Sequence, residues 1–317
     1  MLLNNSCNNV YSLSVIILTF NEEKHIVRCI SSVKDIATEI FVIDSFSTDH
    51  TVMLAEAAGA VVLRHSWENS YSRQLNWAID HLPVSGEWVM RLDADEYLTL
   101  ELASELRERL PRLDGSISGI NVRRRIHFLG RWMHHGGTYP MWVLRIWRNG
   151  YGRCEDRWMD EHIQLVSGRS TRFQHDLIDE NLNDLSWWTG KHNQYANREA
   201  ADLLLLKYCY GSGGSTFSAL DGQANIKRKA KEQIYSRLPL FIRSGFYFIY
   251  RFVLLAGFLD GVEGLIWSVL QGFWYRFLVD AKIFEAELYL AKSRNKREDV
   301  NRWLTERWGL NPPKEER

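Results

Sequence analysis

The chain has 317 residues, which is long enough for one large domain or for a domain with an added segment. Hydrophobic residues make up 45% of it and charged residues 25%, as in a globular protein with a substantial core. Lys plus Arg and Asp plus Glu each total 39, so the net charge is zero and no global field favours nucleic acid as a partner.

The cysteines and the N-terminal residues bear on the cellular compartment. The four cysteines are Cys7, Cys29, Cys154 and Cys209, and none are paired at CxxC spacing. We expect them to be reduced thiols of a cytosolic protein. The first twelve residues lack the charged and apolar regions of a signal peptide, which agrees with a cytoplasmic location.

Short apolar runs alternate with helical patterns in the first hundred residues. The runs, each expected to be a strand, cover residues 12–20, 39–45, 60–65 and 87–92. Helices are expected after Asn21, which could cap the first of them, and over 47–59 and 70–82. Strands joined by helical crossovers predict a mainly parallel α/β sheet of Rossmann-like type. The stretch TFNEEK after the first strand has no glycine, which excludes the GxGxxG fingerprint of dinucleotide sites.

The middle of the chain has a less regular pattern. Residues 111–180 read as strands broken by a loop at Gly136 and Gly137. A long helix is expected over 182–207, and a basic helix over 225–237.

The C-terminal part contains two long apolar stretches, at 238–261 and 264–284. Both are long enough to suggest a membrane span, but charged residues interrupt them. An arginine in mid-bilayer, such as Arg243 or Arg251, costs about 2.5 kcal/mol or more. We therefore expect amphipathic helices that lie in a membrane interface, aided by the cations of 225–237. A helical hairpin that packs on the protein's own core is the alternative.

Polar and acidic side chains follow three of the expected strands, and ligands of open α/β sheets bind beyond the carboxyl ends of strands. These residues are Thr19, Asn21 and Glu22, then Asp44, then Asp93 and Asp95. Two carboxylates two residues apart can approach one divalent ion, and oxygen ligands suit Mg²⁺ or Mn²⁺. A polar strand end is the alternative, and Glu96 is expected to be an ordinary acid.

Three segments resemble family 2 glycosyltransferases of the GT-A fold, of the lipopolysaccharide- and polysaccharide-biosynthesis type. They are SVIILTFNEEKHI (14–26), EIFVIDSFSTDHT (39–51) and WVMRLDADEYL (88–98). The resemblance implies a site for a nucleotide-diphosphate sugar, usually a UDP-sugar. Phe46 and His50 replace the two glycines of the family's Asp-Ser-Gly-Ser-Thr-Asp-Gly-Thr motif, so the conformation of this loop is open.

The same resemblance implies a domain organisation. A catalytic domain would cover 1–237, with a nucleotide-binding half at about 12–110 and an acceptor half at about 111–237. The remaining residues, 238–317, would form a helical region that associates with a membrane.

The resemblance also implies individual roles. Asp44 would accept a hydrogen bond from the uracil N–H, and Asp95 would coordinate the metal directly. Asp93 would contact the ribose or bind the metal through water, while His175 would be a third ligand or a diphosphate contact. The other residues expected to bind the nucleotide sugar are Thr19, Asn21, Glu22, Arg73, Asn76 and Lys191. For Arg73 and Lys191 a solvated helix face is the alternative.

Inverting transfer needs a base that removes the proton of the acceptor hydroxyl. Asp160 and Glu161 resemble the acidic motif of the lipopolysaccharide-type enzymes, and Glu161 is favoured over Asp160. Glu155 and Asp156 form the competing pair, and an acidic surface turn is the alternative to both.

Trp132 and Trp142 flank a loop at 136–140 that resembles the acceptor-side loop of the same enzymes. The leading interpretation is an inverting, Mn²⁺- or Mg²⁺-dependent enzyme that moves a hexose from a nucleotide-diphosphate sugar to a glycan. The acceptor would be a lipid-linked oligosaccharide at the inner face of the cytoplasmic membrane, in lipopolysaccharide, O-antigen or exopolysaccharide biosynthesis. The alternatives are a polyprenyl-phosphate sugar transferase and a non-catalytic glycan-binding scaffold that retains the fold.

Overall fold

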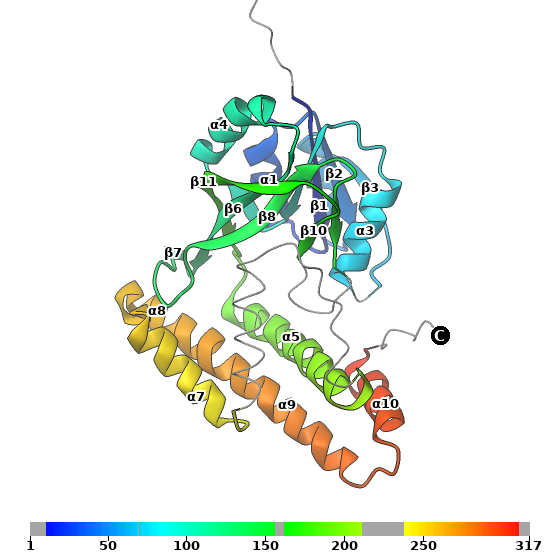
Figure 1. Cartoon of the computed structure of the whole chain (residues 1–317), viewed down its shortest axis with the longest axis vertical. Coiled ribbons are helices and arrows are strands. Elements are labelled where there is room, and N and C mark those ends of the chain that lie inside the picture. Colours follow the sequence, from blue (N-terminus) through cyan, green and yellow to red (C-terminus); the bar gives the residue numbers. More distant parts are fainter. Residues whose placement is uncertain (1–10, 69, 156–161, 211–237, 311–317) are drawn as a thin grey trace, which may run out of the picture. The chain divides into compact units, whose positions relative to one another are not determined.

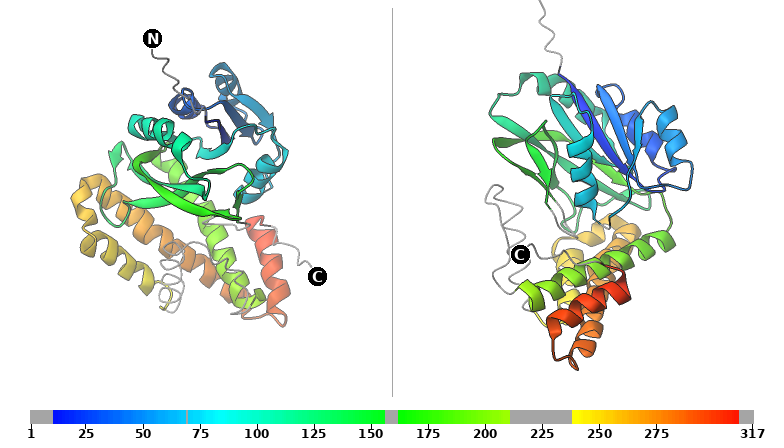
Figure 2. Two further views of the ribbon diagram at one scale, coloured as in Figure 1. Left: turned by 45° about the horizontal axis from the view of Figure 1, so that its top comes forward. Right: turned by 90° about the vertical axis from the view of Figure 1, so that its right-hand side faces the viewer.

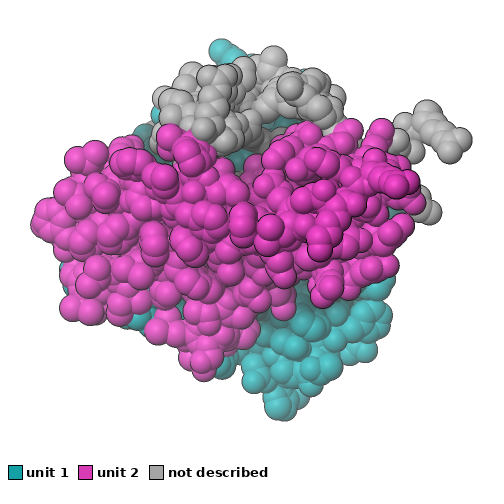
Figure 3. All heavy atoms as spheres, turned by 90° about the horizontal axis from the view of Figure 1, so that it is seen from below, with its two compact units in different colours: residues 1–134, 138–156, 161–182 teal, residues 135–137, 157–160, 183–317 magenta. Residues whose placement is uncertain are grey.

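The computed structural model describes residues 11–68, 70–155, 162–210 and 238–310. The chain divides into two compact units, coloured separately in Figure 3. Unit 1 comprises residues 1–134, 138–156 and 161–182, and unit 2 comprises residues 135–137, 157–160 and 183–317. The domain change expected at residue 237 lies outside the described residues, and the described chain changes unit after Leu182.

Unit 1 begins with four parallel strands in the order β3-β2-β1-β4 (Figure 1). They are β1 (Leu13–Thr19), β2 (Glu39–Asp44), β3 (Val61–Arg64) and β4 (Trp88–Asp93). The helices between them are α1 (Ile26–Val33), α2 (Thr51–Ala57) and α3 (Tyr71–His81). The α/β alternation expected from the sequence is therefore confirmed.

The second half of unit 1 extends the same sheet beyond β4, where the order continues β8-β6-β11-β5. These strands are β8 (Met141–Arg148), β6 (Ile117–Phe128), β11 (Arg169–Glu180) and β5 (Glu96–Leu98), with β7 (Arg131–Trp132) paired to β6. β8 runs antiparallel to β4, so the parallel nucleotide-type half joins a mixed half. A separate hairpin consists of β9 (Gly152–Cys154) and β10 (Ile163–Leu165).

Apolar residues cover both faces of the sheet. One core cluster joins β1, β2 and β4 to α1, α2 and α4 (Leu100–Arg109), which a short 3-10 turn, η1 (Leu110–Arg112), follows. The other cluster joins the opposite face to α3 and to the β9–β10 hairpin. β1 is buried on both faces, and five of its seven residues are apolar; the two exceptions are Ser14 and Thr19.

The first helix starts later than the sequence predicts. Its N-cap is His25, and Asn21 lies outside the helix with a φ of 55°. The Asn21 Oδ1 atom accepts from the backbone N–H of Thr48 at 2.8 Å instead of capping α1. Asparagine tolerates a left-handed backbone, which explains why it occupies this turn and not the cap.

Unit 2 is helical, and its core lies where α5 packs on α9, side by side in Figure 2 (green and orange). Small residues, Ala196, Ala200 and Ala201 of α5, allow this approach. The elements are α5 (Leu185–Leu205), η2 (Leu206–Tyr210), α7 (Ile242–Ile249), η5 (Tyr250–Leu254), η6 (Gly257–Asp260), α8 (Gly261–Trp267), η7 (Ser268–Trp274), α9 (Tyr275–Leu290) and α10 (Lys296–Trp308).

The apolar stretches of unit 2 form a bent pair of helical segments. No single helix in the described part of the chain is long and apolar enough to cross a membrane. Ile242–Leu254 and Gly257–Leu290 meet that criterion of length and composition only when taken together, and they are bent by 71°.

Candidate active site

Three strands of the parallel sheet end at one edge. Thr19 of β1 is in register with Asp44 of β2, and Leu18 is in register with Asp93 of β4. β1 and β4 are neighbours in the sheet but are separated in sequence by two other strands. This is the crossover point at which open α/β sheets place their ligands. The structure thus brings together the polar strand ends that the sequence singled out.

The loops that follow β1 and β2 are hydrogen-bonded to each other. The backbone N–H of Asn21 donates to Ser47 Oγ at 2.8 Å, and the N–H of Glu22 donates to Thr51 Oγ1 at 2.7 Å. The Asn21 side chain accepts in return from Thr48. The two loops therefore form one continuous wall beside the strand ends.

Asp44, the last residue of β2, stabilises this wall at the strand end. Its side chain is fully buried, and Oδ2 accepts from the backbone N–H of Ser47 at 2.9 Å. Thr19 Oγ1 donates to Oδ1 at 3.4 Å. Both oxygens are thus hydrogen-bonded inside the protein, and each keeps a further acceptor site.

Phe46 stands where the family motif has a glycine, and its φ is 62°. The loop therefore keeps the left-handed backbone that a glycine would adopt without a Cβ penalty. His50, at the second replaced glycine, has an ordinary φ of −84°. Phe46 therefore adopts a strained backbone conformation, whereas His50 does not.

We expect Phe46→Gly to raise the free energy of unfolding by about 1 kcal/mol, because left-handed geometry costs an L-residue roughly 1–2 kcal/mol and glycine entropy offsets part of that. Phe20→Gly is the matched control, since Phe20 is similarly exposed (57% against 53%) and has no positive φ. Chemical denaturation measures both variants. An equal loss of stability in the two would contradict the strain at Phe46.

Asp93, at the end of β4, is surrounded by donors. The hydroxyl of Tyr71 donates to Oδ1, and Arg91 Nη2 lies 3.2 Å from Oδ2. Arg145 Nη2 of β8 lies 3.4 Å from the same Oδ2. Burial raises the pKa of Asp93, but the positive charges of Arg91 and Arg145 outweigh it and hold that pKa well below its usual range. Asp93 is therefore an ionised carboxylate with most of its acceptor sites in use.

Glu96 has a structural role that the sequence did not predict. The expectation of an ordinary acid is wrong, because its side chain is 1% exposed and forms an ion pair with Arg145. Its Oε2 also accepts from the backbone N–H of Asp93 at 3.0 Å, which fixes the turn between β4 and β5. Burial raises the pKa of Glu96 to about 7 against the opposing charge of Arg145.

A further acid, Asp179 of β11, pairs in register with Glu96. Burial raises its pKa to about 6, and the charges of Asp95 and Asp93 add to this effect while Arg124 opposes it. Four carboxylates thus meet three guanidinium groups at this edge, those of Arg91, Arg124 and Arg145.

Asp95 lies in the turn after β4 and is half-buried. Its Oδ2 accepts from Asn181 Nδ2 at 3.0 Å, and its backbone carbonyl accepts from the N–H of Glu180 at 3.1 Å. Within the described ranges, no other hydrogen bond to this carboxylate is found. Asp95 and Asp179, whose carboxylate has an ion pair with Arg124 at 3.6 Å, are therefore the acids of this group with the most capacity left for a ligand.

His25 joins the wall to the end of β11. Its ring is 1% exposed, and Nε2 accepts from the backbone N–H of Leu182 at 2.8 Å. Because Nε2 accepts, the proton sits on Nδ1, which donates to Glu22 Oε2 at 2.6 Å. His25 thereby connects Glu22 to Leu182. The residue before Leu182, Asn181, donates to Asp95.

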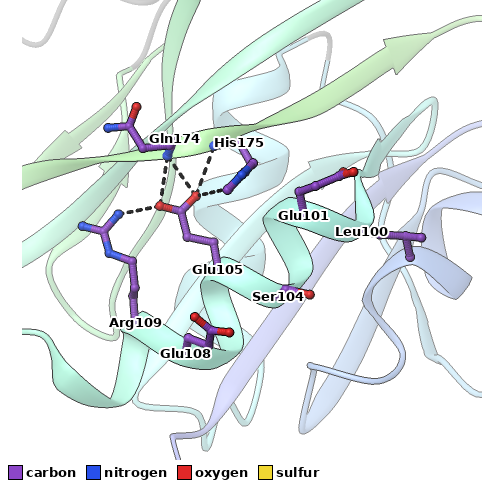
Figure 4. A pocket seen from close by; sticks show the side chains of 8 residues that line it. All are labelled: Leu100, Glu101, Ser104, Glu105, Glu108, Arg109, Gln174 and His175. Atoms are coloured by element: carbon purple, nitrogen blue, oxygen red, sulfur yellow. Dashed lines mark hydrogen bonds and ion pairs between the residues drawn. The ribbon is translucent and has the colours of Figure 1, made fainter.

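The structure places His175 elsewhere. Its Nδ1 lies 2.8 Å from Oε2 of Glu105 on α4, and both line a pocket of about 530 Å³ (Figure 4). Asp93 and Asp95 do not line this pocket. Three residues of β11 separate His175 from Asp179, the residue in register with Glu96. The expected role of His175 as a third metal ligand is therefore not supported by this geometry.

Glu105 provides a test of this second cluster. Burial raises its pKa, but hydrogen bonds from the backbone N–H of Gln174 and from His175 and Arg109 outweigh it, so the pKa lies below 4.5. A depressed pKa stabilises the fold above the unfolded pKa, and the contribution is lost as the pH falls through the folded pKa. We expect Glu105→Gln to cost roughly 1.5–3 kcal/mol at pH 7 and less at pH 4.

Thermal unfolding at pH 7 and pH 4 measures this difference. Glu108→Gln, an exposed acid of the same pocket, is the control and should change stability little at either pH. An equal loss for Glu105→Gln at both pH values would refute the linkage.

The other expected contacts have separate surroundings. Asn76 Nδ2 donates to the carbonyl of Cys154 at 2.9 Å, and its Oδ1 accepts from the N–H of Cys154 at 3.0 Å. Asn76 therefore holds β9 in place. Arg73 is 44% exposed at the start of α3, 4.0 Å from Glu68. Lys191 belongs to unit 2, where its Nζ lies 4.5 Å from the ring centroid of Trp187.

His192, beside Lys191, does not supply a cation. Its ring stacks on Trp188 with centroids 3.5 Å apart, and burial lowers its pKa to about 4. At neutral pH it is therefore uncharged.

Asp160 and Glu161, the expected bases, and Asp156 of the competing pair lie outside the described residues. The residues on either side are fixed: the N–H of Glu155 donates to the carbonyl of His162 at 3.0 Å, next to the β9–β10 pairing. Gln164 Nε2 donates to Glu155 Oε1 at 2.5 Å.

The donor atoms at the strand edge fit a hard divalent cation. Mg²⁺ and Mn²⁺ prefer oxygen ligands and commonly use one or two protein carboxylates together with substrate phosphates. Asp95 supplies such a carboxylate directly, whereas Asp93, whose oxygens already accept from Tyr71, Arg91 and Arg145, would contribute through a water. No group of three or more His, Cys, Asp or Glu side chains suited to a metal occurs among the described residues.

Comparison with known proteins identifies the family. The profile of glycosyl transferase family 2 matches residues 14–181, more than half of the chain. The chain belongs to glycosyl transferase family 2. The family 2 match and the observed sheet agree with the GT-A fold that the sequence implied, and this glycosyltransferase carries the strand-edge carboxylates inside the matched region.

Several relatives are similar to this glycosyltransferase. An uncharacterized glycosyltransferase of Rickettsia typhi is 28% identical over 290 residues, which cover 89% of each chain. One of Rickettsia conorii is 44% identical over 94 residues, 30% of this chain and 32% of the relative. The glycosyltransferase SunS of Bacillus phage SPbeta is 36% identical over 27% of this chain and 20% of its own.

Solved structures are similar over a shorter part. The glucosyl-3-phosphoglycerate synthase of Mycobacterium tuberculosis, in complex with Mn²⁺, UDP and glucosyl-3-phosphoglycerate, is 24% identical, with a TM-score of 0.32. The match covers 36% of this chain and 44% of the synthase. At this TM-score the likeness carries no conclusion about the substrate of this glycosyltransferase.

Proposed function

We propose that this glycosyltransferase transfers a hexose, with inversion, from a nucleotide-diphosphate sugar, most simply a UDP-sugar, to a lipid-linked glycan in lipopolysaccharide, O-antigen or exopolysaccharide biosynthesis. The observation that carries the proposal is the convergence of Asp93, Asp95 and the β1–β2 loop wall at one sheet edge within a family 2 region. Carboxylates at the strand ends suit a cation-bound diphosphate, and the wall suits a nucleoside.

Each residue at this edge has a distinct part in the proposal. Asp95 would hold Mn²⁺ or Mg²⁺, and Asp93 would contribute through a water or contact the ribose. The cation, when bound, neutralises charge that develops on the departing diphosphate. Thr19, Asn21 and Glu22 would line the nucleoside. Asp44 stabilises this wall through its hydrogen bonds from Thr19 and Ser47.

The cationic side chains around Asp93 support this division of work. Arg91 and Arg145 hold Asp93 ionised and oriented, so its carboxylate is in place before a ligand arrives. Asn181 orients Asp95, and His25 fixes the chain beside Asn181 to the nucleoside wall. Preorganised groups of this kind lower the cost of binding and of reaching the transition state.

Glu161, or Asp160, would remove the proton from the acceptor hydroxyl as it attacks the anomeric carbon. Asn76 holds β9, which precedes these acids in the chain, through its two hydrogen bonds to Cys154. Arg73 and Lys191 stay proposed contacts of the diphosphate or sugar.

We further propose that the enzyme works at the inner surface of the cytoplasmic membrane. The cations of residues 225–237 and the apolar surface of the helices that follow support this location. A lipid-linked acceptor would then be presented at the surface to which the enzyme is attached.

A screen of UDP-, GDP- and dTDP-sugars by thermal shift with and without Mn²⁺ tests the donor class, since a ligand of the native state raises apparent stability. We expect a shift with one nucleotide class that depends on Mn²⁺. Transfer to a polyprenyl-phosphate and to a polyprenyl-linked oligosaccharide then separates the two acceptor types. Absence of metal-dependent binding or turnover for every donor would refute the proposed function.

A further inference from the structure

The two bent helical segments of unit 2, Ile242–Leu254 and Gly257–Leu290, form a hairpin with two arms. Most of its exposed side chains are hydrophobic, the reverse of the usual surface of a soluble protein. Between Phe241 and Asp280 thirteen side chains are exposed, and all of them are hydrophobic. Two of them, Leu254 and Val262, are 71% and 68% exposed. The exposed residues are Ile242, Phe246, Ile249, Tyr250, Val253, Leu254, Phe258, Leu259, Val262, Leu265, Val269, Phe273 and Phe277. Soluble proteins rarely leave large apolar patches exposed, and such patches often mark a site of interaction with a protein or a membrane.

Two charged residues of the same segment, Arg243 and Asp280, face inward. Arg243 is 4% exposed and Asp280 is fully buried, and they form an ion pair in which Nε donates to Oδ1 at 2.7 Å. Asp280 Oδ2 also accepts from the backbone N–H of Phe241 at 2.7 Å. The pair therefore ties the start of the first arm to α9, and it removes the objection to lipid contact that Arg243 raises in the sequence.

Polar side chains at the bend between the arms also find hydrogen-bond partners within the protein. Asp260 accepts from the backbone N–H of His135 at 2.8 Å and lies 2.6 Å from its Nδ1. Arg251 Nε donates to the carbonyl of Gly136 at 2.6 Å. These partners all belong to unit 2, so the polar groups at the bend are matched inside the same compact body.

Aromatic rings hold the two arms together. Phe248 and Phe273 lie with ring centroids 6.3 Å apart, and Phe241 and Phe277 with centroids 5.0 Å apart. At the bend a Cβ on Gly257 would come within 3.0 Å of the carbonyl oxygen of Arg251, so the chain turns closely there. The hairpin is thus a packed unit whose exposed side chains between Phe241 and Asp280 are hydrophobic. Figure 1 shows its helices as α7, α8 and α9.

We propose that this hairpin inserts its outer face into the hydrocarbon of one leaflet of a lipid bilayer, as a monotopic anchor. The inference rests on the membrane location proposed above and replaces interfacial attachment by insertion. The hydrocarbon of a bilayer, unlike a protein partner, offers no hydrogen bonds, and a face whose exposed side chains are hydrophobic suits it. Protein interfaces instead carry a polar rim and regular hydrogen bonds.

The length of the hairpin decides between insertion and crossing. The arm Ile242–Leu254 has a rise of roughly 20 Å at 1.5 Å per residue, against about 30 Å for the hydrocarbon core. This arm is too short to cross, and the ring contacts of Phe241 with Phe277 and of Phe248 with Phe273 show that the second arm runs back along the first. Entry into one leaflet agrees with this geometry.

The test uses the full chain on vesicles of phosphatidylethanolamine and phosphatidylglycerol, with flotation in 1 M NaCl. Such salt screens the attraction of the basic segment but leaves apolar insertion intact. We expect the wild type to float and to resist extraction at pH 11. Val262→Glu should partition about 100-fold less, because a mid-membrane acid is strongly disfavoured.

Val166→Glu is the matched control: it is the same substitution at the same exposure, 69% against 68%, in unit 1. It should float as the wild type does. Complete release of the wild type by 1 M NaCl, or equal flotation of the two variants, would overturn the insertion. So would a Val262→Glu variant that turns a dimer into a monomer without a change in flotation, because the face would then be an interface between copies.

The outcome is separable from that of the proposed function. Metal-dependent hydrolysis of the donor, measured without vesicles, reports on the catalytic edge and should be equal in wild type and Val262→Glu. Insertion without such hydrolysis refutes the proposed transfer alone, and hydrolysis without insertion refutes the anchor alone.

Discussion

Asp95→Asn should lower the metal-dependent turnover of this glycosyltransferase by about 1000-fold. The reason is that metal-ion catalysis is worth several kcal/mol and each 1.36 kcal/mol corresponds to a factor of ten in rate. Asparagine keeps the size of the side chain and an oxygen to accept from Asn181, so the turn should keep its shape. Steady-state kinetics over a Mn²⁺ titration measures the effect, with a large loss in kcat and a weaker apparent affinity for Mn²⁺.

Asp35→Asn is the control for Asp95→Asn, since Asp35 is an exposed acid of the same unit, away from the strand edge. It should retain full turnover. Unchanged Mn²⁺-dependent turnover in a correctly folded Asp95→Asn variant would remove Asp95 from the metal site. A loss of folding, seen by circular dichroism, would assign it a structural role instead.

Asp280→Ala should destabilise the chain by about 3–5 kcal/mol, because it leaves the buried charge of Arg243 without its partner. The double variant Arg243→Met/Asp280→Leu should recover most of this loss, since apolar residues of similar volume can replace a buried ion pair. Denaturant unfolding monitored at the same protein concentration gives the three free energies.

Glu287→Ala is the control for Asp280→Ala. Glu287 lies on the same helix and pairs with Lys207, which is 55% exposed, so its removal should cost less than about 1 kcal/mol. A double variant as unstable as the single one would mean that the aspartate acts by its hydrogen bond to Phe241 and not by its charge.

The strand edge could be predicted from the sequence because parallel strands bring their carboxyl ends together. Thr19, Asp44 and Asp93 were assigned to one edge from the apolar runs alone, and the register confirms it. Arg91 and Arg145 were not assigned to the site, although a single arginine within an apolar run, as in WVMRLD and VLRIW, was a signal for an internal ion pair.

His175 shows why residue type and approximate position are not enough. The sequence placed a histidine in the expected region, but the register of β11 sets it beside Glu105 on α4. Strand register depends on pairing with β6 and β5, which are distant in sequence, and no local pattern encodes it.

The sequence by itself determined the α/β class, the family, the acidic strand edge and the apolar character of the C-terminal helices. These properties follow from local periodicity and from motifs whose residues are near in sequence. Only the tertiary structure decided that Glu96 is a buried anchor, that Asp44 closes a turn, and that Arg243 and Asp280 neutralise each other. Those outcomes depend on which charged side chains meet across long sequence separations. A buried charge is costly without a partner, whereas a paired one is tolerated and holds its surroundings in place.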